Sequence, residues 1–111
     1  MRSKNEVIIA DLLDRLAQGR WAYEQPLTLD RQTRYPDFAI HTDDPDRPLY
    51  WEHLGMFNNP HYAARWDAKR QGYAQHGILP GPGGGPSGIL LVTDDRDGVY
   101  EPAWEAEFKA L

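Results

Sequence analysis

Two short stretches decide the fold: RYPDFAI at residues 34–40 and LYWEHLG at residues 49–55. Both are rich in aromatic and aliphatic residues, and each has the length of a short β-strand. The segment between them, TDDPDRP at residues 42–48, consists almost entirely of turn-forming residues. Together the three segments predict a β-hairpin.

Each arm of this hairpin carries one acid, Asp37 on the first and Glu52 on the second. Because side chains alternate along a strand, Asp37 shares a face with Ala39, and Glu52 shares a face with Tyr50 and Leu54. A register that sets Asp37 beside Glu52 would bring two carboxylates together among apolar neighbours. Such carboxylates repel each other and lose hydration, and a divalent cation with oxygen ligands resolves the conflict. The pair is therefore a candidate metal site.

Helices and further strands are expected on both sides of the hairpin. Apolar residues at helical spacing predict the first helix, and Asn59 followed by Pro60 has the pattern of a capped helix start. The expected elements are a helix at 3–18, strands at 21–29, 34–40 and 49–55, a helix at 60–76, a strand at 89–93 and a short helix from 102 onward.

The order of these elements predicts a mixed sheet. Three consecutive strands favour an antiparallel meander, and the last strand can join it in parallel after a helical crossover. Pro26 lacks an N–H group, so the strand at 21–29 is expected at an edge or with a bulge. Residues 30–33 are expected to form a turn, and the glycine- and proline-rich residues 79–88 a flexible loop. The sequence thus predicts one α/β domain over residues 1–111.

The composition excludes several classes of protein. The chain has 111 residues and no cysteine, which excludes disulfides and thiolate metal sites and suits a reducing, cytoplasmic compartment. Its only apolar run near the start, VIIA at residues 7–10, is too short to cross a membrane. The net charge of −5 argues weakly against a nucleic-acid partner, although six acids and two basic residues at 94–111 carry most of it.

The helix expected at 60–76 carries a stripe of aromatic residues that includes a lysine. Tyr62, Trp66, Lys69 and Tyr73 are spaced four, three and four residues apart and therefore share one face. A lysine in such a stripe either lays its stem along the rings to reach water or brings its ammonium to a site on the sheet.

At this point the ordered motifs resemble the PD-(D/E)xK nuclease superfamily, which has a restriction-endonuclease-like fold. The resemblance covers roughly residues 2–94 and is closest to a bacterial branch whose domains occur alone or attached to helicase-like proteins. The segments that carry it are RSK-x-E at 2–6, YE at 23–24, YPDF at 35–38, WEHLGM at 51–56 and K-x-x-x-Y at 69–73.

The resemblance implies a Mg²⁺ site, with Mn²⁺ able to replace Mg²⁺. It assigns Asp37 and Glu52 as metal ligands, together with the backbone carbonyl of His53, and Glu6 on the first helix as an assisting acid. The side chain of His53 points away from the acid face of its strand. Glu24, on the strand beside the hairpin, could reach the site or equally lie on the surface.

One position departs from the family pattern. Leu54 stands where the motif lysine is expected, and Lys69 on the following helix is the candidate for a migrated lysine. Tyr73, one turn after Lys69, matches a helical pattern of helicase-associated relatives. With Lys69 as the catalytic lysine, the implied activity is Mg²⁺-dependent hydrolysis of DNA phosphodiester bonds.

Each of these residues also has an ordinary structural interpretation. Asp37 could belong to a turn, Glu52 could form a cross-strand ion pair, and Glu6 could cap its helix. Tyr73 could be a core residue. The four histidines have no zinc-site spacing, and the glycine-rich loop lacks the ending of a phosphate-binding P-loop. The cationic candidates for phosphate contacts are Arg2, Lys4, Arg31, Arg34, Arg65 and Arg70.

Two other functions stay open. A catalytically inactive nuclease-like domain could bind DNA or a protein partner, and Leu54 in the lysine position favours this alternative. An assembly module could use the many aromatic residues at an oligomer interface. A helicase-like partner or a homodimer is compatible with the nuclease interpretation.

Overall fold

The computed structural model describes residues 4–29, 31–55, 59–81, 83–94 and 101–111, apart from the side chain of residue 101. It contains three helices and seven strands among these residues. In chain order they are α1 (Lys4–Leu16), β1 (Trp21–Tyr23), β2 (Leu27–Leu29), β3 (Gln32–Arg34), β4 (Phe38–Ile40), β5 (Leu49–Leu54), α2 (Pro60–Gln75), β6 (Ile78–Pro80), β7 (Gly88–Asp94) and α3 (Glu101–Lys109).

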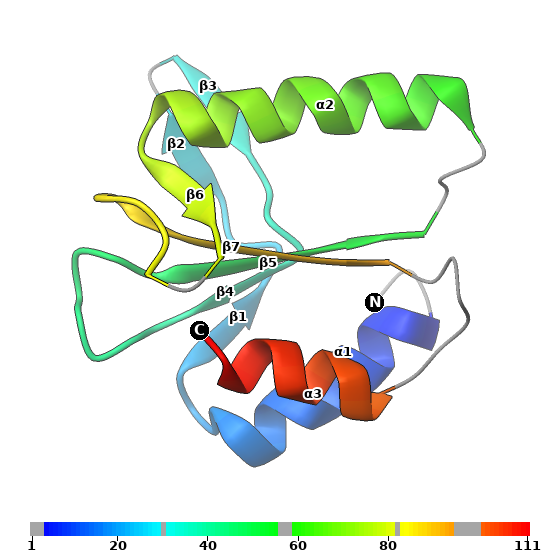
Figure 1. Ribbon diagram of the computed structural model, residues 1–111, viewed down its shortest axis with the longest axis vertical. Coiled ribbons are helices and arrows are strands. Elements are labelled where there is room, and N and C mark those ends of the chain that lie inside the picture. Colours follow the sequence, from blue (N-terminus) through cyan, green and yellow to red (C-terminus); the bar gives the residue numbers. More distant parts are fainter. Residues whose placement is uncertain (1–3, 30, 56–58, 82, 95–100) are drawn as a thin grey trace.

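The main sheet has five strands in the order β1-β4-β5-β7-β6. The pairs β1–β4 and β4–β5 are antiparallel, whereas β7 runs parallel to both β5 and β6. Helix α2 covers one face of this sheet, and α1 and α3 cover the other (Figure 1). The predicted α/β architecture, with a mixed sheet between helices and a parallel strand after the crossover, is confirmed.

The register of the central hairpin sets the two predicted acids opposite each other. Phe38 pairs with Trp51, and Ile40 pairs with Leu49. Extending this register by one residue beyond the strand end places Asp37 opposite Glu52. The predicted antiparallel hairpin is therefore confirmed, with both acids on the sheet face that α2 covers.

The alternation of side chains along β4 and β5 divides the core into two layers. Phe38 and Trp51 point toward α1 and α3, where Trp51 stacks on Phe108 with ring centroids 5.7 Å apart. Tyr50 points the other way and stacks on Tyr73 of α2. All six residues of β5 are buried, as expected of a central strand covered on both faces.

The strand predicted at 21–29 is two strands in two sheets. β1 is an edge strand of the main sheet, as Pro26 indicated, but β2 pairs with β3 in a separate two-stranded sheet. Glu24, with φ of 49°, and Pro26 lie in the break. A left-handed residue and a missing N–H group both interrupt a strand ladder, which explains the division.

Two neighbouring predictions also need correction. The turn predicted at 30–33 is wrong in its second half, because Gln32 and Thr33 belong to β3; residue 30 lies outside the described residues. The first hairpin arm, predicted from residue 34, pairs in the main sheet only from Phe38. Pro36 cannot donate to a ladder, so the chain leaves one sheet and enters the other around it.

The glycine-rich segment contains a strand that its composition did not predict. Ile78–Pro80 form β6, parallel to β7. Beyond it, the Arg47 guanidinium donates to the Gly85 carbonyl at 2.8 Å, and a Cβ at Gly85 would collide with the Gly77 carbonyl oxygen. Gly85 therefore permits a close backbone approach.

The start of α2 follows the predicted signal, and a glycine follows its end. The Asn59 side chain accepts from the His61 backbone N–H at 2.9 Å, and Gly77 follows the helix with φ of 78°. The predicted start of the first helix at residue 3 lies outside the described residues. Among the described residues, no helix combines the length and apolar character that crossing a bilayer requires.

Candidate functional site

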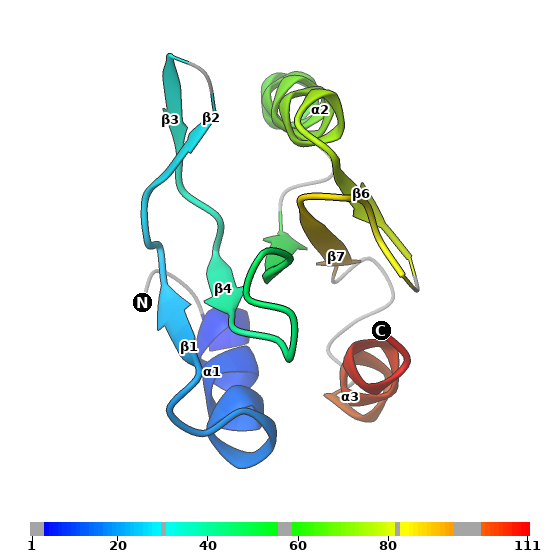
Figure 2. The ribbon, with the colours of Figure 1, turned by 90° about the vertical axis from the view of Figure 1, so that its left-hand side faces the viewer.

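A cleft of about 470 Å³ opens between α2 and the chain that leads from β3 into β4. The end of β5 forms its floor. Figure 2 shows the β2–β3 hairpin on one side and α2 on the other, above the main sheet. The lining residues are Glu24, Thr33, Arg34, Tyr35, Asp37, Glu52, His53, Leu54, Tyr62, Arg65, Trp66 and Lys69.

Two hydrogen bonds between backbone and side chain fix Asp37 beside Glu52. The Asp37 N–H donates to Glu52 Oε1 at 2.8 Å, and Asp37 Oδ2 accepts from the His53 N–H at 2.7 Å. These two bonds continue the hairpin one residue past the end of β4. The other oxygen of Glu52, Oε2, pairs with Lys69, so the two acids are fixed side by side.

Lys69 reaches this pair from α2. Its Nζ lies 2.5 Å from Glu52 Oε2 and donates to the Tyr35 carbonyl at 3.0 Å. The Lys69 side chain is 23% exposed, whereas the Glu52 side chain is only 3% exposed. The aromatic stripe predicted on this helix therefore faces the sheet, and the Lys69 ammonium lies in the same cleft as the two acids.

Burial dominates the electrostatics of Glu52. Desolvation raises the pKa of its carboxyl to about 7, the Lys69 ammonium opposes that rise, and the nearby Asp37 charge adds to it. Glu52 consequently changes its protonation state near neutral pH, with a cation in direct contact.

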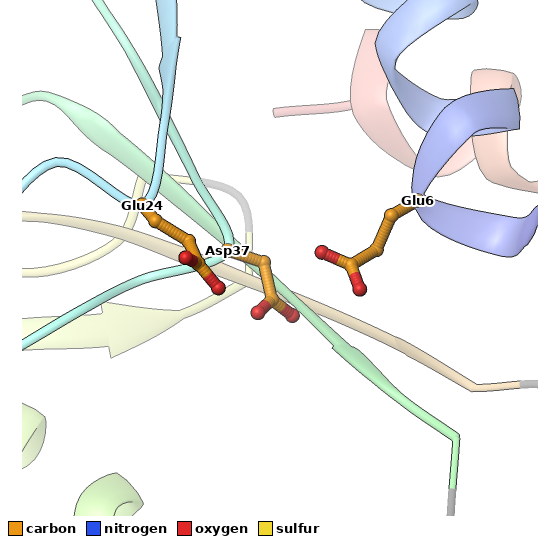
Figure 3. Close-up of side chains that lie close together, drawn as sticks. All are labelled: Glu6, Glu24 and Asp37. Atoms are coloured by element: carbon orange, nitrogen blue, oxygen red, sulfur yellow. The ribbon is translucent and has the colours of Figure 1, made fainter. Parts of the chain in front are cut away.

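A second group of acids shares Asp37 with this pair. One carboxylate oxygen each from Glu6, Glu24 and Asp37 lie within 4.8 Å of one another. Glu6 extends from α1, which packs under the opposite face of the sheet, and points toward the other two (Figure 3). Glu6 is 7% exposed, so this member of the group is buried.

The local backbone brings Glu24 into this group. Its N–H donates to the Asp37 carbonyl at 3.1 Å, directly beyond the β1–β4 ladder. Its φ of 49° is a left-handed conformation that costs a non-glycine residue about 1 kcal/mol or more. The strain coincides with the turn that keeps Glu24 beside Asp37.

Comparison of the chain with protein-family models, with curated proteins and with solved structures finds no match. The function proposed below therefore rests on the residues of the site.

The His53 side chain lies on the other face of the sheet, as the strand alternation predicted. Its Nδ1 contacts Thr93 Oγ1 at 2.9 Å, and that hydroxyl also accepts from Trp51 Nε1 at 2.9 Å. His53 Nε2 lies 3.2 Å from the amide nitrogen of Asn5 on α1. An amide nitrogen only donates, so Nε2 accepts and Nδ1 carries the ring proton. The network ties α1, and with it Glu6, to β5.

Tyr73 belongs to the core layer beneath α2. The residue is fully buried, and its ring stacks on Tyr50 with centroids 6.3 Å apart. Burial raises the pKa of the Tyr73 phenol, and the charges of Glu52 and Asp37 raise it further. Among the described residues, the Tyr73 hydroxyl has no hydrogen-bond partner. This packing agrees with the alternative that Tyr73 is a core residue.

The structure brings together most of the residues that the sequence singled out. Asp37, Glu52 and Lys69 line the cleft together with Glu24, which the sequence could equally have placed on the surface. Glu6 places a carboxylate oxygen beside those of Asp37 and Glu24. The sequence did not single out Tyr35, which lines the cleft and whose only signal was its place in the YPDF motif. Among the cationic candidates, Arg34 and Arg65 line the cleft, whereas Arg2 lies outside the described residues.

Proposed function

We propose that this chain is a divalent-metal-dependent nuclease with a restriction-endonuclease-like fold that hydrolyses DNA phosphodiester bonds in the cleft beside α2. The observation that carries the proposal is the position of Asp37. It contributes to the carboxylate triad with Glu6 and Glu24, and it is hydrogen bonded to Glu52, which pairs with Lys69. Acids on one side and a lysine on the other form the arrangement that the PD-(D/E)xK resemblance implies.

The donor set of the triad fits a small hard cation. All three side chains offer carboxylate oxygens within 4.8 Å of one another, and such ligands suit Mg²⁺ and Mn²⁺. The triad gathers three carboxylates, whereas Lys69 pairs with Glu52, and a divalent cation would offset the negative charge of the triad. A bound cation would polarise the phosphate and lower the pKa of a coordinated water.

The residues of the chain supply the remaining functions. Lys69 can donate to a phosphate oxygen as negative charge develops during hydrolysis. Glu52 is the ligand that the resemblance assigns, and its pKa of about 7 lets its carboxyl take up or release a proton near neutral pH. Arg34 and Arg65 on the cleft walls can contact neighbouring phosphates.

The test combines a cleavage assay with thermal melting. We expect the wild type to degrade DNA with Mg²⁺ or Mn²⁺, and we expect EDTA or the Asp37→Asn substitution to abolish this activity. Saturating Mn²⁺ should raise the melting temperature of the wild type but not of Asp37→Asn. Asp11→Asn, an exposed acid on α1, is the matched control and should retain both effects. Cleavage that survives both Asp37→Asn and Glu52→Gln would overturn the proposal.

The second candidate function is that of an inactive nuclease-like domain that binds DNA or a protein partner. It is favoured by Leu54, which occupies the position of the motif lysine and is buried. The same two measurements distinguish it, because an inactive domain would be stabilised by Mn²⁺ without cleaving DNA under any of the conditions.

A further inference from the structure

Tyr35 is an exposed aromatic residue beside the acids of the cleft. The residue is 55% exposed, although it lies between buried Pro36 and half-buried Arg34. Its own carbonyl accepts from Lys69 Nζ, so the backbone that carries the ring is held against α2. An exposed ring on such a fixed backbone can offer its face to a ligand in the cleft.

The opposite wall of the cleft is aromatic as well. Tyr62 and Trp66 of α2 line it, one helical turn apart and both half-buried. Single exposed apolar residues are common on protein surfaces. Three aromatic residues around one polar cleft, directly above carboxylates, are instead the composition of a site that stacks bases.

A second hollow of about 630 Å³ adjoins the cleft and shares Arg34 with it. It lies between the β2–β3 hairpin and the C-terminal half of α2, the two elements that stand side by side in Figure 2. Arg31, Gln32, Gln75 and His76 line it, and none of its described lining residues is an acid. The lining therefore changes from acidic at the cleft floor to cationic in this hollow, where Arg31 and Arg34 lie.

We propose that the cleft and the adjoining hollow together form a strand route that binds an unpaired DNA strand. In this complex a base stacks on Tyr35, and the following phosphates contact Arg34 and Arg31. The inference rests on the proposed function for the identity of the polymer. Bases inside a duplex are stacked on each other and offer no free face to a protein ring. A cleft of about 470 Å³ has the volume of a small-molecule site, which suits a displaced nucleotide better than an intact duplex.

The experiment measures binding of a labelled oligothymidylate of about 12 nucleotides, a length typical of single-strand sites, by fluorescence anisotropy. The same labelled strand annealed to its complement is the duplex probe. Both are titrated in Ca²⁺ and again in EDTA, with probe integrity checked by electrophoresis. The wild type should bind the single strand at least tenfold more tightly than the duplex.

The variants separate stacking from charge. Tyr35→Ala should weaken single-strand binding about fivefold or more, whereas Tyr35→Phe should retain it. Arg31→Ala should lower the slope of log affinity against log salt by about 0.7. Val7→Ala and Arg20→Ala are matched controls, an exposed apolar residue on α1 and an exposed cation beyond its end, and neither should change binding.

The inference is overturned if the duplex binds as tightly as the single strand in both buffers, if neither probe binds, or if Tyr35→Ala binds like the wild type. The proposed function fails separately. Tight single-strand binding without cleavage would refute the nuclease and leave the strand route in place. Cleavage of duplex DNA without any single-strand preference would refute the strand route and leave the nuclease proposal in place.

Discussion

Lys69 Nζ lies 2.5 Å from Glu52 Oε2, joining the third turn of α2 to the central strand of the sheet. Glu52 is buried and Lys69 is partly exposed, so the ammonium stands between the carboxylate and the open cleft. The two residues are 17 positions apart in the sequence, and the packing of α2 on the sheet brings them into contact.

Replacing Lys69 with methionine should lower DNA cleavage about 100-fold or more, because one preorganised donor to a developing charge contributes about that much. The substitution should leave the Mn²⁺-induced rise in melting temperature in place, since the carboxylate triad is retained. Lys109→Met on α3, whose ammonium pairs with Glu105, makes the same chemical change and is the matched control. Unchanged cleavage by Lys69→Met would exclude the migrated lysine.

Glu52 should make the metal-free protein less stable as the pH rises. The folded-state pKa of about 7 lies above the ordinary 4.5, so between these values the folded chain holds a proton that the unfolded chain releases. The contribution of Glu52 is therefore fully present below pH 4.5 and is lost on the way to about pH 7, on the order of 3 kcal/mol.

Glu52→Gln, which mimics the protonated carboxyl, should flatten this pH dependence. Urea unfolding in EDTA at a series of pH values measures it, and Glu105→Gln on α3 makes the same chemical change away from the cleft. A profile for Glu52→Gln as steep as that of the wild type would show that burial does not control this carboxyl.

Glu24→Gly should raise the stability of the metal-free protein by about 1 kcal/mol while weakening Mn²⁺ binding. Glycine adopts the left-handed φ of 49° without strain, although its greater freedom in the unfolded chain offsets part of the gain. The lost carboxylate is one of the three in the triad. Glu24→Gln separates the two effects, because it keeps the strain and removes only the charge. Equal Mn²⁺ stabilisation in all three proteins would show that Glu24 is not a ligand.

Thr93→Val should destabilise the protein by about 1–3 kcal/mol, because Trp51 Nε1 and His53 Nδ1 both lose their buried acceptor. Thr93→Ser should largely restore stability, and Thr28→Val on the exposed side of β2 should have little effect. Chemical denaturation provides the comparison. If Thr93→Val unfolds at the wild-type denaturant concentration, the network does not contribute to holding α1 against β5.

The sequence predicted the hairpin well because its signals are local. Turn residues at 42–48 and alternating side chains fix both the antiparallel pairing and the face of Asp37 and Glu52. Asn59 and Gly77 likewise fixed the ends of α2. The division of residues 21–34 between two sheets was missed, since a strand's partner depends on residues distant in sequence.

The carboxylate triad also could not be predicted from local sequence signals. The motifs indicated that Glu6 and Asp37 belong to one site. For Glu24, the sequence did not decide between this site and the surface. Only the packing of α1 beneath the sheet, and the left-handed turn after β1, bring the three carboxylates within 4.8 Å. Alternation along a strand cannot predict such a meeting, because it depends on the angle at which a helix crosses the opposite face.

By itself, the sequence determined which residues are acidic, aromatic or cationic, where the hairpin turns, and which face of β5 each side chain takes. The tertiary structure alone decided that Lys69 reaches Glu52, that Glu24 joins Glu6 and Asp37, and that Tyr35 stands exposed beside them. The physical reason is that hydrogen-bonded periodicity is a property of neighbouring residues. A site is built by burial, which folds distant segments against one another.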